Sequence, residues 1–161
     1  MPLPQTNSPA TNTDWLTPRW ILDALGEFDL DPCCPDSMPW ATAKRMICLP
    51  EDGLAAEWSG RMWLNPPFRG AYPWVKRLRE HGNGIALLPC ATDTNIFFDN
   101  VWGHASGVLF IKRRVIFFRP DGTKPKNNIN RPCCLVAYGA QNLAALIASG
   151  LAGALVTEVK R

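Results

Sequence analysis

The 161-residue sequence lacks several features that mark common classes of protein. No apolar run approaches the roughly 20 residues that a membrane-spanning helix needs. The N-terminal segment 1–14 has neither a basic start nor an apolar stretch, so we expect no secretory signal. A Ser/His/Asp set, a phosphate-binding loop and a cluster of metal ligands are also missing. These absences predict a soluble, cytoplasmic protein without a metal and without a membrane partner.

Cysteine is present, but no pair has the C-x-x-C spacing of a zinc site or a redox motif. The six cysteines form two adjacent pairs and two single positions: Cys33-Cys34, Cys133-Cys134, Cys48 and Cys90. In a chain with no expected export signal, buried free thiols are the favoured interpretation. A disulfide and a cysteine-based metal module are the alternatives, and the second predicts stoichiometric zinc.

Acidic residues are scarce in the second part of the chain. Residues 1–60 carry three Lys/Arg and nine Asp/Glu, whereas residues 61–161 carry fourteen Lys/Arg and five Asp/Glu. Such a basic region suggests an anionic partner such as nucleic acid, although solvated surface charge explains it equally well.

Strand-like and helix-like segments alternate along most of the chain, which indicates an α/β fold with a largely parallel sheet. We expect strands at 28–31, 45–49, 61–64, 84–89, 108–111, 115–118, 134–138 and 155–159, and helices at 17–25, 72–81, 93–102 and 141–149. A loop rather than a helix joins the late strands, which suggests antiparallel strands at one edge. Residues 1–14 are interpreted as a flexible lead-in, and residues 15–161 as one domain with a basic loop at 119–132.

The sharpest motif is Trp63-Leu64-Asn65-Pro66-Pro67-Phe68, an apolar strand that ends in Asn-Pro-Pro-aromatic. Open α/β sheets bind ligands at the carboxyl ends of their strands. The prolines fix the backbone and lack N–H donors, so the Asn65 side-chain oxygen and the Pro66 carbonyl remain as acceptors. With Phe68 as a flat apolar face, the set suits a planar group that bears an NH2. A proline-rich turn is the structural alternative.

Asn-Pro-Pro-Phe resembles the signature of S-adenosylmethionine-dependent amino-methyltransferases. The wider order of motifs resembles the phage-type Dam family of DNA adenine-N6 methyltransferases over roughly residues 14–138. The matching segments are Trp15-Leu-Thr-Pro18, Leu30-Asp-Pro-Cys-Cys34, Asp52-Gly-Leu54 with Trp58, Asn65-Pro-Pro-Phe68, Leu87-Leu-Pro89 with Thr92-Asp-Thr94, and Arg114-Val-Ile-Phe117.

The resemblance implies a Rossmann-like class I methyltransferase sheet, mostly parallel with an antiparallel edge strand. It also implies S-adenosylmethionine as cofactor, DNA as substrate and Asn65, Pro66, Pro67 and Phe68 as catalytic residues. Acceptors at Asn65 and Pro66 would favour the pyramidal nitrogen of the transition state, and positioning would provide most of the rate. The target base would be flipped out of the duplex and stacked on Phe68.

The cofactor-binding residues that the resemblance implies come from three segments: Trp15, Thr17, Pro18, Asp31, Pro32, Cys33 and Asp52. Asp31 would contact the ammonium of the cofactor or a bridging water, or it satisfies loop amides instead. Thr17 binds the carboxylate, caps a helix, or does both. Asp52 is either a cofactor contact or a turn residue. The segment from Asp31 to Asp52 contains no glycine, unlike the cofactor loop of many methyltransferases.

Basic side chains are the candidates for DNA contact, because Lys and Arg bind phosphate. They are Arg69, Lys76, Arg77, Arg113, Arg114, Arg119, Lys124, Lys126 and Arg131. Asn127 and Asn128 are candidates for reading base edges.

Two rivals to a DNA adenine methyltransferase remain open on the sequence. One is an enzyme of the same chemistry that acts on RNA or protein glutamine, which the basic region disfavours. The other is a DNA-binding relative that has lost catalysis, which the glycine-poor cofactor segment keeps open. No obligate protein partner is expected. Because little chain lies outside the catalytic fold, sequence specificity would have to come from loops.

Overall fold

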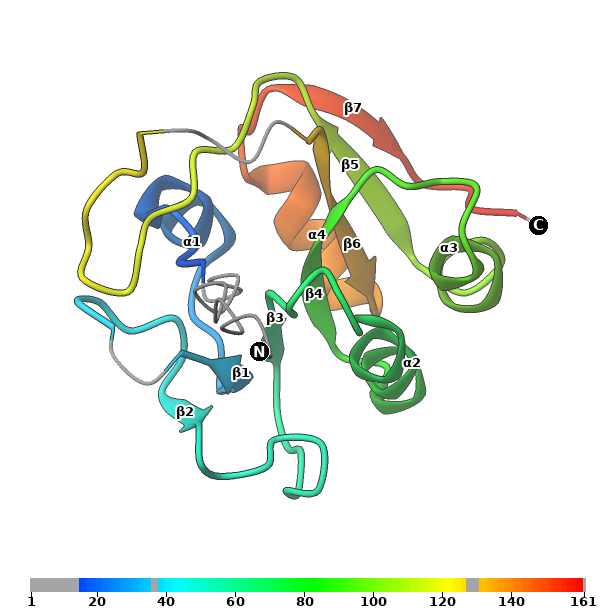
Figure 1. The fold of residues 1–161 in the computed structure, drawn as a ribbon. Helices are drawn as coiled ribbons and strands as arrows, with labels where there is room; N and C mark the ends of the chain where they lie inside the picture. The colour runs from blue at the N-terminus through cyan, green and yellow to red at the C-terminus, as the bar shows by residue number, and fades with distance from the viewer. Residues whose placement is uncertain (1–14, 36–37, 127–130, 161) are drawn as a thin grey trace, which may run out of the picture.

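The computed structural model describes residues 15–35, 38–126 and 131–160. In this part of the chain a seven-stranded sheet has the order β2-β1-β3-β4-β6-β5-β7 (Figure 1). The strands are β1 (Leu30–Cys34), β2 (Arg45–Cys48), β3 (Met62–Leu64), β4 (Gly84–Pro89), β5 (Gly107–Ile111), β6 (Cys133–Tyr138) and β7 (Gly153–Val156). The helices are α1 (Arg19–Leu25), α2 (Tyr72–His81), α3 (Asn95–Asn100) and α4 (Ala140–Ala148).

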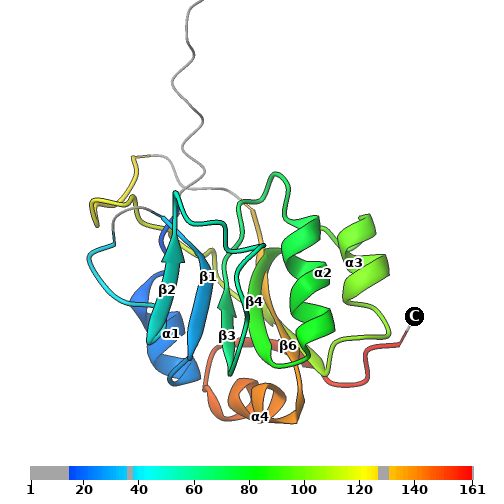
Figure 2. The same cartoon turned by 90° about the horizontal axis from the view of Figure 1, so that it is seen from below.

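Strand direction brings five strand ends to one edge of the sheet. β2, β1, β3 and β4 pair in parallel, and β6 is antiparallel to both β4 and β5. β4 and β5 therefore run in the same direction, and the carboxyl ends of β1 to β5 lie at one edge. Figure 2 shows this edge at the ends of β1 to β4. We call it the carboxyl edge.

The predicted α/β fold is confirmed, but the predicted mostly parallel sheet is not. β7 is antiparallel to β5 at the end of the sheet, and β6 is an interior strand that is antiparallel to both neighbours. The sheet therefore has as many antiparallel strand pairs as parallel ones. The physical reason is the connection between β5 and β6, whose described residues contain no helix, so the chain returns in the opposite direction.

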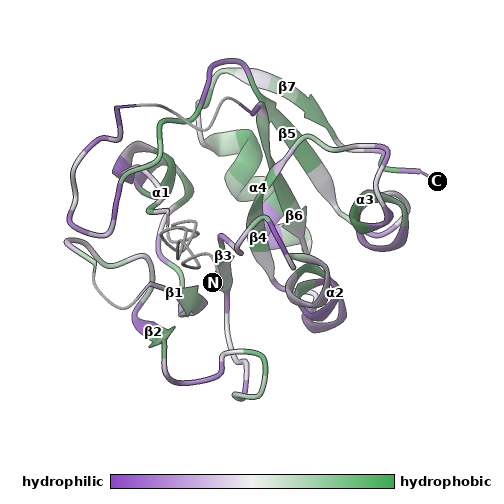
Figure 3. Cartoon of the chain, viewed as in Figure 1, coloured by the Kyte–Doolittle hydropathy of each residue, from purple (hydrophilic) through white to green (hydrophobic). Residues whose placement is uncertain are grey.

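Two layers of helices cover the sheet. α1 and α4 pack against one face in a core that includes Ile21, Trp63 and Leu146, and α2 and α3 pack against the other with Val75 and Phe97. β6 is buried along its whole length, as its uninterrupted apolar sequence predicts. Hydrophilic residues lie on the outer sides of α2 and α3 (Figure 3).

Most predicted elements are confirmed, with α2 and β4 at their predicted bounds. β1 is shifted toward the C-terminus, so that Pro32 and Cys33 belong to it. The predicted strand at 115–118 is wrong: it makes one isolated bridge, between Phe118 and Leu16. Its alternating apolar residues bury Val115 and Phe117 against the α1 side of the core without a neighbouring strand.

The start of α1 also differs from the prediction. Pro18 occupies the N-cap position, and no side chain caps the helix. Thr17 lies one residue too early to do so, and its buried hydroxyl has no hydrogen-bond partner among the described residues. This hydroxyl is therefore available for another role.

One pair of cysteines corrects the expectation of free thiols. Cys34 and Cys48 form a disulfide, with their Cα atoms 4.7 Å apart. The two residues are register partners at the ends of the parallel strands β1 and β2, a proximity that spacing along the chain does not reveal. Cys133 and Cys134 are buried thiols as predicted, and burial raises the pKa of Cys133 to about 12.

Candidate active site

A cavity of about 260 Å³ lies at the carboxyl edge, near the ends of β1, β2 and β3. Its volume is close to the lower end of the roughly 300–1,000 Å³ range of small-molecule sites. We call it the main cavity, and its lining is mostly apolar, with two carboxylates at one side. It is lined by Trp15, Pro32, Cys33, Cys34, Pro35, Ile47, Leu49, Pro50, Glu51, Asp52, Gly53, Asn65, Pro67 and Trp74.

A second, smaller cavity of about 10 Å³ adjoins the main cavity and shares Trp15, Cys33 and Asn65 with it. It has room for about one water molecule. Asp31, Thr17 and Trp63 also line this small polar cavity. The Thr17 hydroxyl and the Trp63 indole N–H are buried there without a hydrogen-bond partner in the described part of the chain. Because unsatisfied buried donors are costly, the arrangement indicates a site for a polar ligand group.

Asp31 is a buried carboxylate beside these two donors. It accepts hydrogen bonds from the Thr42 hydroxyl at 2.5 Å and from the Cys33 backbone N–H at 3.0 Å. Burial raises the pKa of Asp31 to about 6, although both hydrogen bonds oppose the rise. A buried carboxylate with a raised pKa in a cavity is typical of a functional site. Its ionised form destabilises the fold unless a bound ligand compensates for the buried charge.

Asn65 begins the loop after β3 and lines both cavities. Its side-chain Nδ2 donates a hydrogen bond to the backbone carbonyl of Trp15 at 2.8 Å. A carbonyl oxygen accepts only, so this contact fixes which end of the amide is nitrogen. The Oδ1 atom of Asn65 is thereby left to accept a hydrogen bond from a ligand.

Phe68 ends the Asn-Pro-Pro-Phe segment and lines a separate pocket of about 150 Å³. The other residues of this Phe68 pocket come from β4, α3, the N-cap of α2 and the segments next to β4, α3 and β6, namely Ala71, Leu88, Pro89, Ala91, Thr94, Ile96, Phe97 and Arg131. The Phe68 ring is half-buried and meets Phe117 edge-on, with ring centroids 6.0 Å apart. A flat ring beside a pocket of this size suits an aromatic base.

The loop that carries Asp52 closes the main cavity next to Pro32. The Asp52 carboxylate is exposed and accepts a hydrogen bond from the Leu54 backbone N–H at 2.9 Å. The predicted turn role is therefore present, and Asp52 also lines the main cavity, so the two interpretations of Asp52 are compatible.

The predicted cofactor residues are brought together with one exception. Trp15, Thr17, Asp31, Pro32, Cys33 and Asp52 line one or both cavities, whereas Pro18 lines neither. Pro18 is buried and occupies the N-cap position of α1. Its fixed backbone angle suits the start of a helix.

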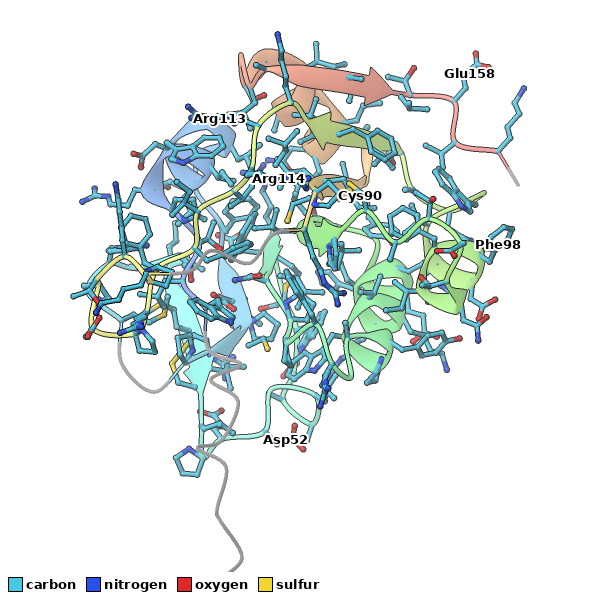
Figure 4. All side chains as sticks on the ribbon, turned by 45° about the horizontal axis from the view of Figure 1, so that its top comes forward. Asp52, Cys90, Phe98, Arg113, Arg114 and Glu158 are labelled. Carbon is cyan, nitrogen blue, oxygen red and sulfur yellow. A yellow bond between two sulfur atoms is a disulfide. The ribbon has the colours of Figure 1, made fainter. Side chains whose placement is uncertain are left out.

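The predicted DNA-contacting residues are mostly exposed: Arg69, Arg113, Arg114, Arg119, Lys124, Lys126 and Arg131. Arg113 and Arg114 are well separated from Asp52 (Figure 4). The Arg113 guanidinium lies over the Trp20 ring, 4.1 Å from its centroid. Asn127 and Asn128 fall outside the described residues. Arg77 is not available for phosphate, because it donates hydrogen bonds to backbone carbonyls.

The model of a family described as DNA N-6-adenine-methyltransferase (Dam) matches residues 5–145. The chain belongs to this family. No curated protein and no solved structure matches it. The resemblance deduced from the motifs is thus confirmed, and the protein is a DNA adenine-N6 methyltransferase. In the described part of the chain, no helix is long and apolar enough to cross a membrane, and no group of three His, Cys, Asp or Glu side chains is placed to hold a metal ion.

Sequence reasoning missed three residues of the site in this methyltransferase. Trp63 was interpreted as a strand residue, but it also lines the small polar cavity, and its buried indole N–H has no hydrogen-bond partner among the described residues. Thr42 holds the carboxylate of Asp31, and Trp74 lines the main cavity from α2. Thr42 and Trp74 lie outside the recognised motifs, so the sequence did not point to them. Trp63 directly precedes Leu64-Asn65, and its place in this motif could have suggested a role in the site.

Proposed function

We propose that this enzyme binds S-adenosylmethionine in the main cavity, with a bridging water in the small polar cavity, and methylates adenine N6 of DNA. The target base enters the Phe68 pocket, and Asn65 lies between the two ligands. Asn65 carries the proposal, since it borders both cofactor cavities and its oriented amide leaves Oδ1 free. The common direction of β1 to β5, with β6 inserted, supports a Rossmann-like methyltransferase sheet.

The residues present fit S-adenosylmethionine. A single water in the small polar cavity would link the Asp31 carboxylate and the unpartnered donors of Thr17 and Trp63 to the amino-acid end of a cofactor in the main cavity. The main cavity offers the aromatic rings of Trp15 and Trp74 for a purine. Glu51 and Asp52 follow β2, where nucleotide-binding α/β folds place an acidic residue for ribose hydroxyls.

When bound, S-adenosylmethionine supplies a methyl group on a positively charged sulfonium sulfur. Asn65 Oδ1 and the Pro66 carbonyl accept the two hydrogens of the adenine N6 amino group. These hydrogen bonds favour a pyramidal nitrogen and so raise its nucleophilicity in the transition state. Asn65 does not act as a base: after the transfer the methylated nitrogen would lose one proton to water, and S-adenosylhomocysteine would leave. Trp15 fixes the amide through its carbonyl, so that the acceptor is oriented before the substrate binds.

Phe68 is expected to act by stacking, so Phe68→Tyr and Phe68→Trp should keep substantial activity and Phe68→Ala should lose about ten- to a hundredfold in kcat/KM. That range follows from roughly 1–3 kcal/mol per stacked base. Because the ring is half-buried, Phe68→Ala should keep a melting temperature near that of the wild type. Steady-state kinetics and thermal melting provide the two measurements.

A target adenine in a mismatch tests the same assignment, because flipping costs less there. If Phe68 holds the flipped base, the mismatch restores part of the rate that Phe68→Ala loses. A much lower melting temperature without any mismatch effect would instead assign Phe68 to the core.

Three exposed cations of the basic loop are expected to contact DNA phosphates. Neutralising Lys124, Lys126 and Arg131 together should weaken DNA binding and lower the slope of log K against log salt by up to about 3. Binding of fluorescent DNA at several salt concentrations measures both quantities.

A matched control removes three cations that are ion-paired with carboxylates elsewhere and are not DNA-contact candidates: Lys44, Arg45 and Lys160. This control should leave the salt slope near that of the wild type. Equal changes in the two triple variants would mean that net charge alone, rather than the loop, attracts DNA.

Calorimetric titration with S-adenosylmethionine tests the proposed cofactor directly. We expect one binding site per chain. A protein that binds DNA without detectable binding of S-adenosylmethionine would be a DNA-binding relative that has lost catalysis, and the proposal would be wrong.

A further inference from the structure

The guanidinium of Arg77 is hydrogen-bonded to the backbone of the Asp52 loop. Arg77 lies on α2, and its Nη1 atom donates to the carbonyls of Leu54 and, at 3.4 Å, Gly53. Its Nη2 atom donates to the Ala56 carbonyl at 2.5 Å. Three carbonyls of one loop are thus satisfied by one side chain.

Trp58 reinforces this arrangement from the loop itself. Its indole Nε1 donates to the Gly53 carbonyl at 2.8 Å, and its ring lies under the Arg77 guanidinium, 4.6 Å from the centroid. The Asp52 carbonyl accepts the N–H groups of Ala55 and Ala56 at 3.1 and 3.0 Å. The loop is therefore a compact turn whose outward carbonyls point to Arg77.

The position of this loop determines one wall of the main cavity. Gly53 packs so closely on β1 that a Cβ there would collide with the Pro32 carbonyl, and both residues line the cavity. Asp52 precedes Gly53 directly, so a movement of the loop moves its carboxylate. The side chain that fixes the loop thus fixes the acidic side of the cavity.

We propose that Arg77 is a positioning residue for S-adenosylmethionine: it holds residues 53–56 so that Asp52 faces the bound ribose. This inference rests on the proposed function. Arginine suits the role because its planar group presents several N–H donors in a fixed fork and stacks on an aromatic face. A lysine offers one compact ammonium group and cannot reach three carbonyls with the same geometry.

A lysine outside the candidate site and outside the DNA-contact candidates provides the control for the loss of charge at Arg77. Lys160 is exposed, and its Nζ atom lies 3.6 Å from Glu158 Oε2, with no hydrogen bond to the Asp52 loop among the contacts of the described residues. Lys160→Met therefore removes the same charge without disturbing the Asp52 loop.

The test measures the Kd for S-adenosylmethionine by calorimetry, and kcat at saturating cofactor, in the full-length protein. We expect Arg77→Met to raise Kd about tenfold or more, a change of about 1.4 kcal/mol per factor of ten, with kcat within about twofold of the wild type. Arg77→Lys should recover part of the affinity, and Lys160→Met should change neither quantity. If Arg77→Met fails to fold, the smaller loss in Arg77→Lys provides the same comparison.

A double-mutant cycle with Asp52→Asn separates positioning from general destabilisation. If Arg77 acts through Asp52, the losses in cofactor affinity in the double variant are smaller than the two single losses combined. Additive losses, an unchanged Kd, or a loss of DNA affinity with normal cofactor affinity would each overturn the inference. A wild-type protein that does not bind S-adenosylmethionine would instead overturn the proposed function itself.

Discussion

Replacing Asn65 with alanine is expected to lower kcat by about a hundred- to a thousandfold, the usual cost of removing one hydrogen-bonding group that acts in the transition state. The Oδ1 atom of Asn65 is oriented by the hydrogen bond from Nδ2 to the Trp15 carbonyl, so it is ready to accept from the adenine amino group. Single-turnover methylation of a DNA duplex at saturating cofactor measures the effect.

Two controls accompany this variant. Affinity for S-adenosylhomocysteine should stay within a few-fold of the wild type, because Asn65 is one of many residues that line the main cavity. Asn65→Asp should also be slow, since it places a carboxylate against the Trp15 carbonyl and loses the donor that fixes the side chain. Near-normal turnover in Asn65→Ala would contradict the proposed mechanism.

Replacing Asp31 with asparagine is expected to stabilise the fold at pH 7.5 while weakening cofactor binding by about tenfold or more. A pKa raised from 3.8 to about 6 corresponds to roughly 3 kcal/mol of destabilisation by the ionised form. Part of this gain is lost, because one amide oxygen cannot replace both carboxylate oxygens toward Thr42 and Cys33. Denaturant unfolding and calorimetry measure the two effects.

The difference in folding stability between the wild type and Asp31→Asn depends on pH, and its sign follows from the raised pKa of Asp31. Between about pH 4 and pH 6 the folded protein holds the Asp31 proton that the unfolded chain releases, so the Asp31 contribution destabilises the fold progressively as pH rises through this window. The stability advantage of Asp31→Asn should therefore be small near pH 4 and complete above about pH 6.5. Affinity for the cationic cofactor should strengthen over the same range in the wild type alone.

Opposite effects on stability and binding are what distinguish a functional carboxylate from a structural one. A structural Asp31 that only satisfied loop amides would lose stability on replacement and leave cofactor affinity unchanged. That result would remove Asp31 from the proposed site.

The proposed catalytic motif could be found in the sequence, because Asn65, Pro66, Pro67 and Phe68 are consecutive and follow a strand whose end can be located. Asp31 and Asp52 were also predicted from the sequence, and each lines one of the two cavities. The pairing of β1 with β2 could not be deduced, so the proximity of Cys34 and Cys48 was missed.

Long-range contacts explain the other differences. The proposed role of Arg77 depends on the packing of α2 beside a loop more than twenty residues earlier in the chain. The sequence alone favours a solvated side chain for a basic residue on an amphipathic helix. Whether the indole N–H of Trp63 has a hydrogen-bond partner depends on the residues that surround it in the fold, and among the described residues it has none. The interior position of β6 depends on the long connection after β5, which spacing alone does not orient.

The proposed reaction is tested most directly by mass analysis of nucleosides. Plasmid DNA is incubated with the purified enzyme and methyl-labelled S-adenosylmethionine, and its nucleosides are then analysed. The wild type should produce labelled N6-methyladenine, and Asn65→Ala should produce about a hundredfold less or lower still at equal protein concentration. Equal amounts of labelled N6-methyladenine from the wild type and from Asn65→Ala would contradict the proposed site. Label found only in nucleosides other than adenosine would contradict the proposed chemistry.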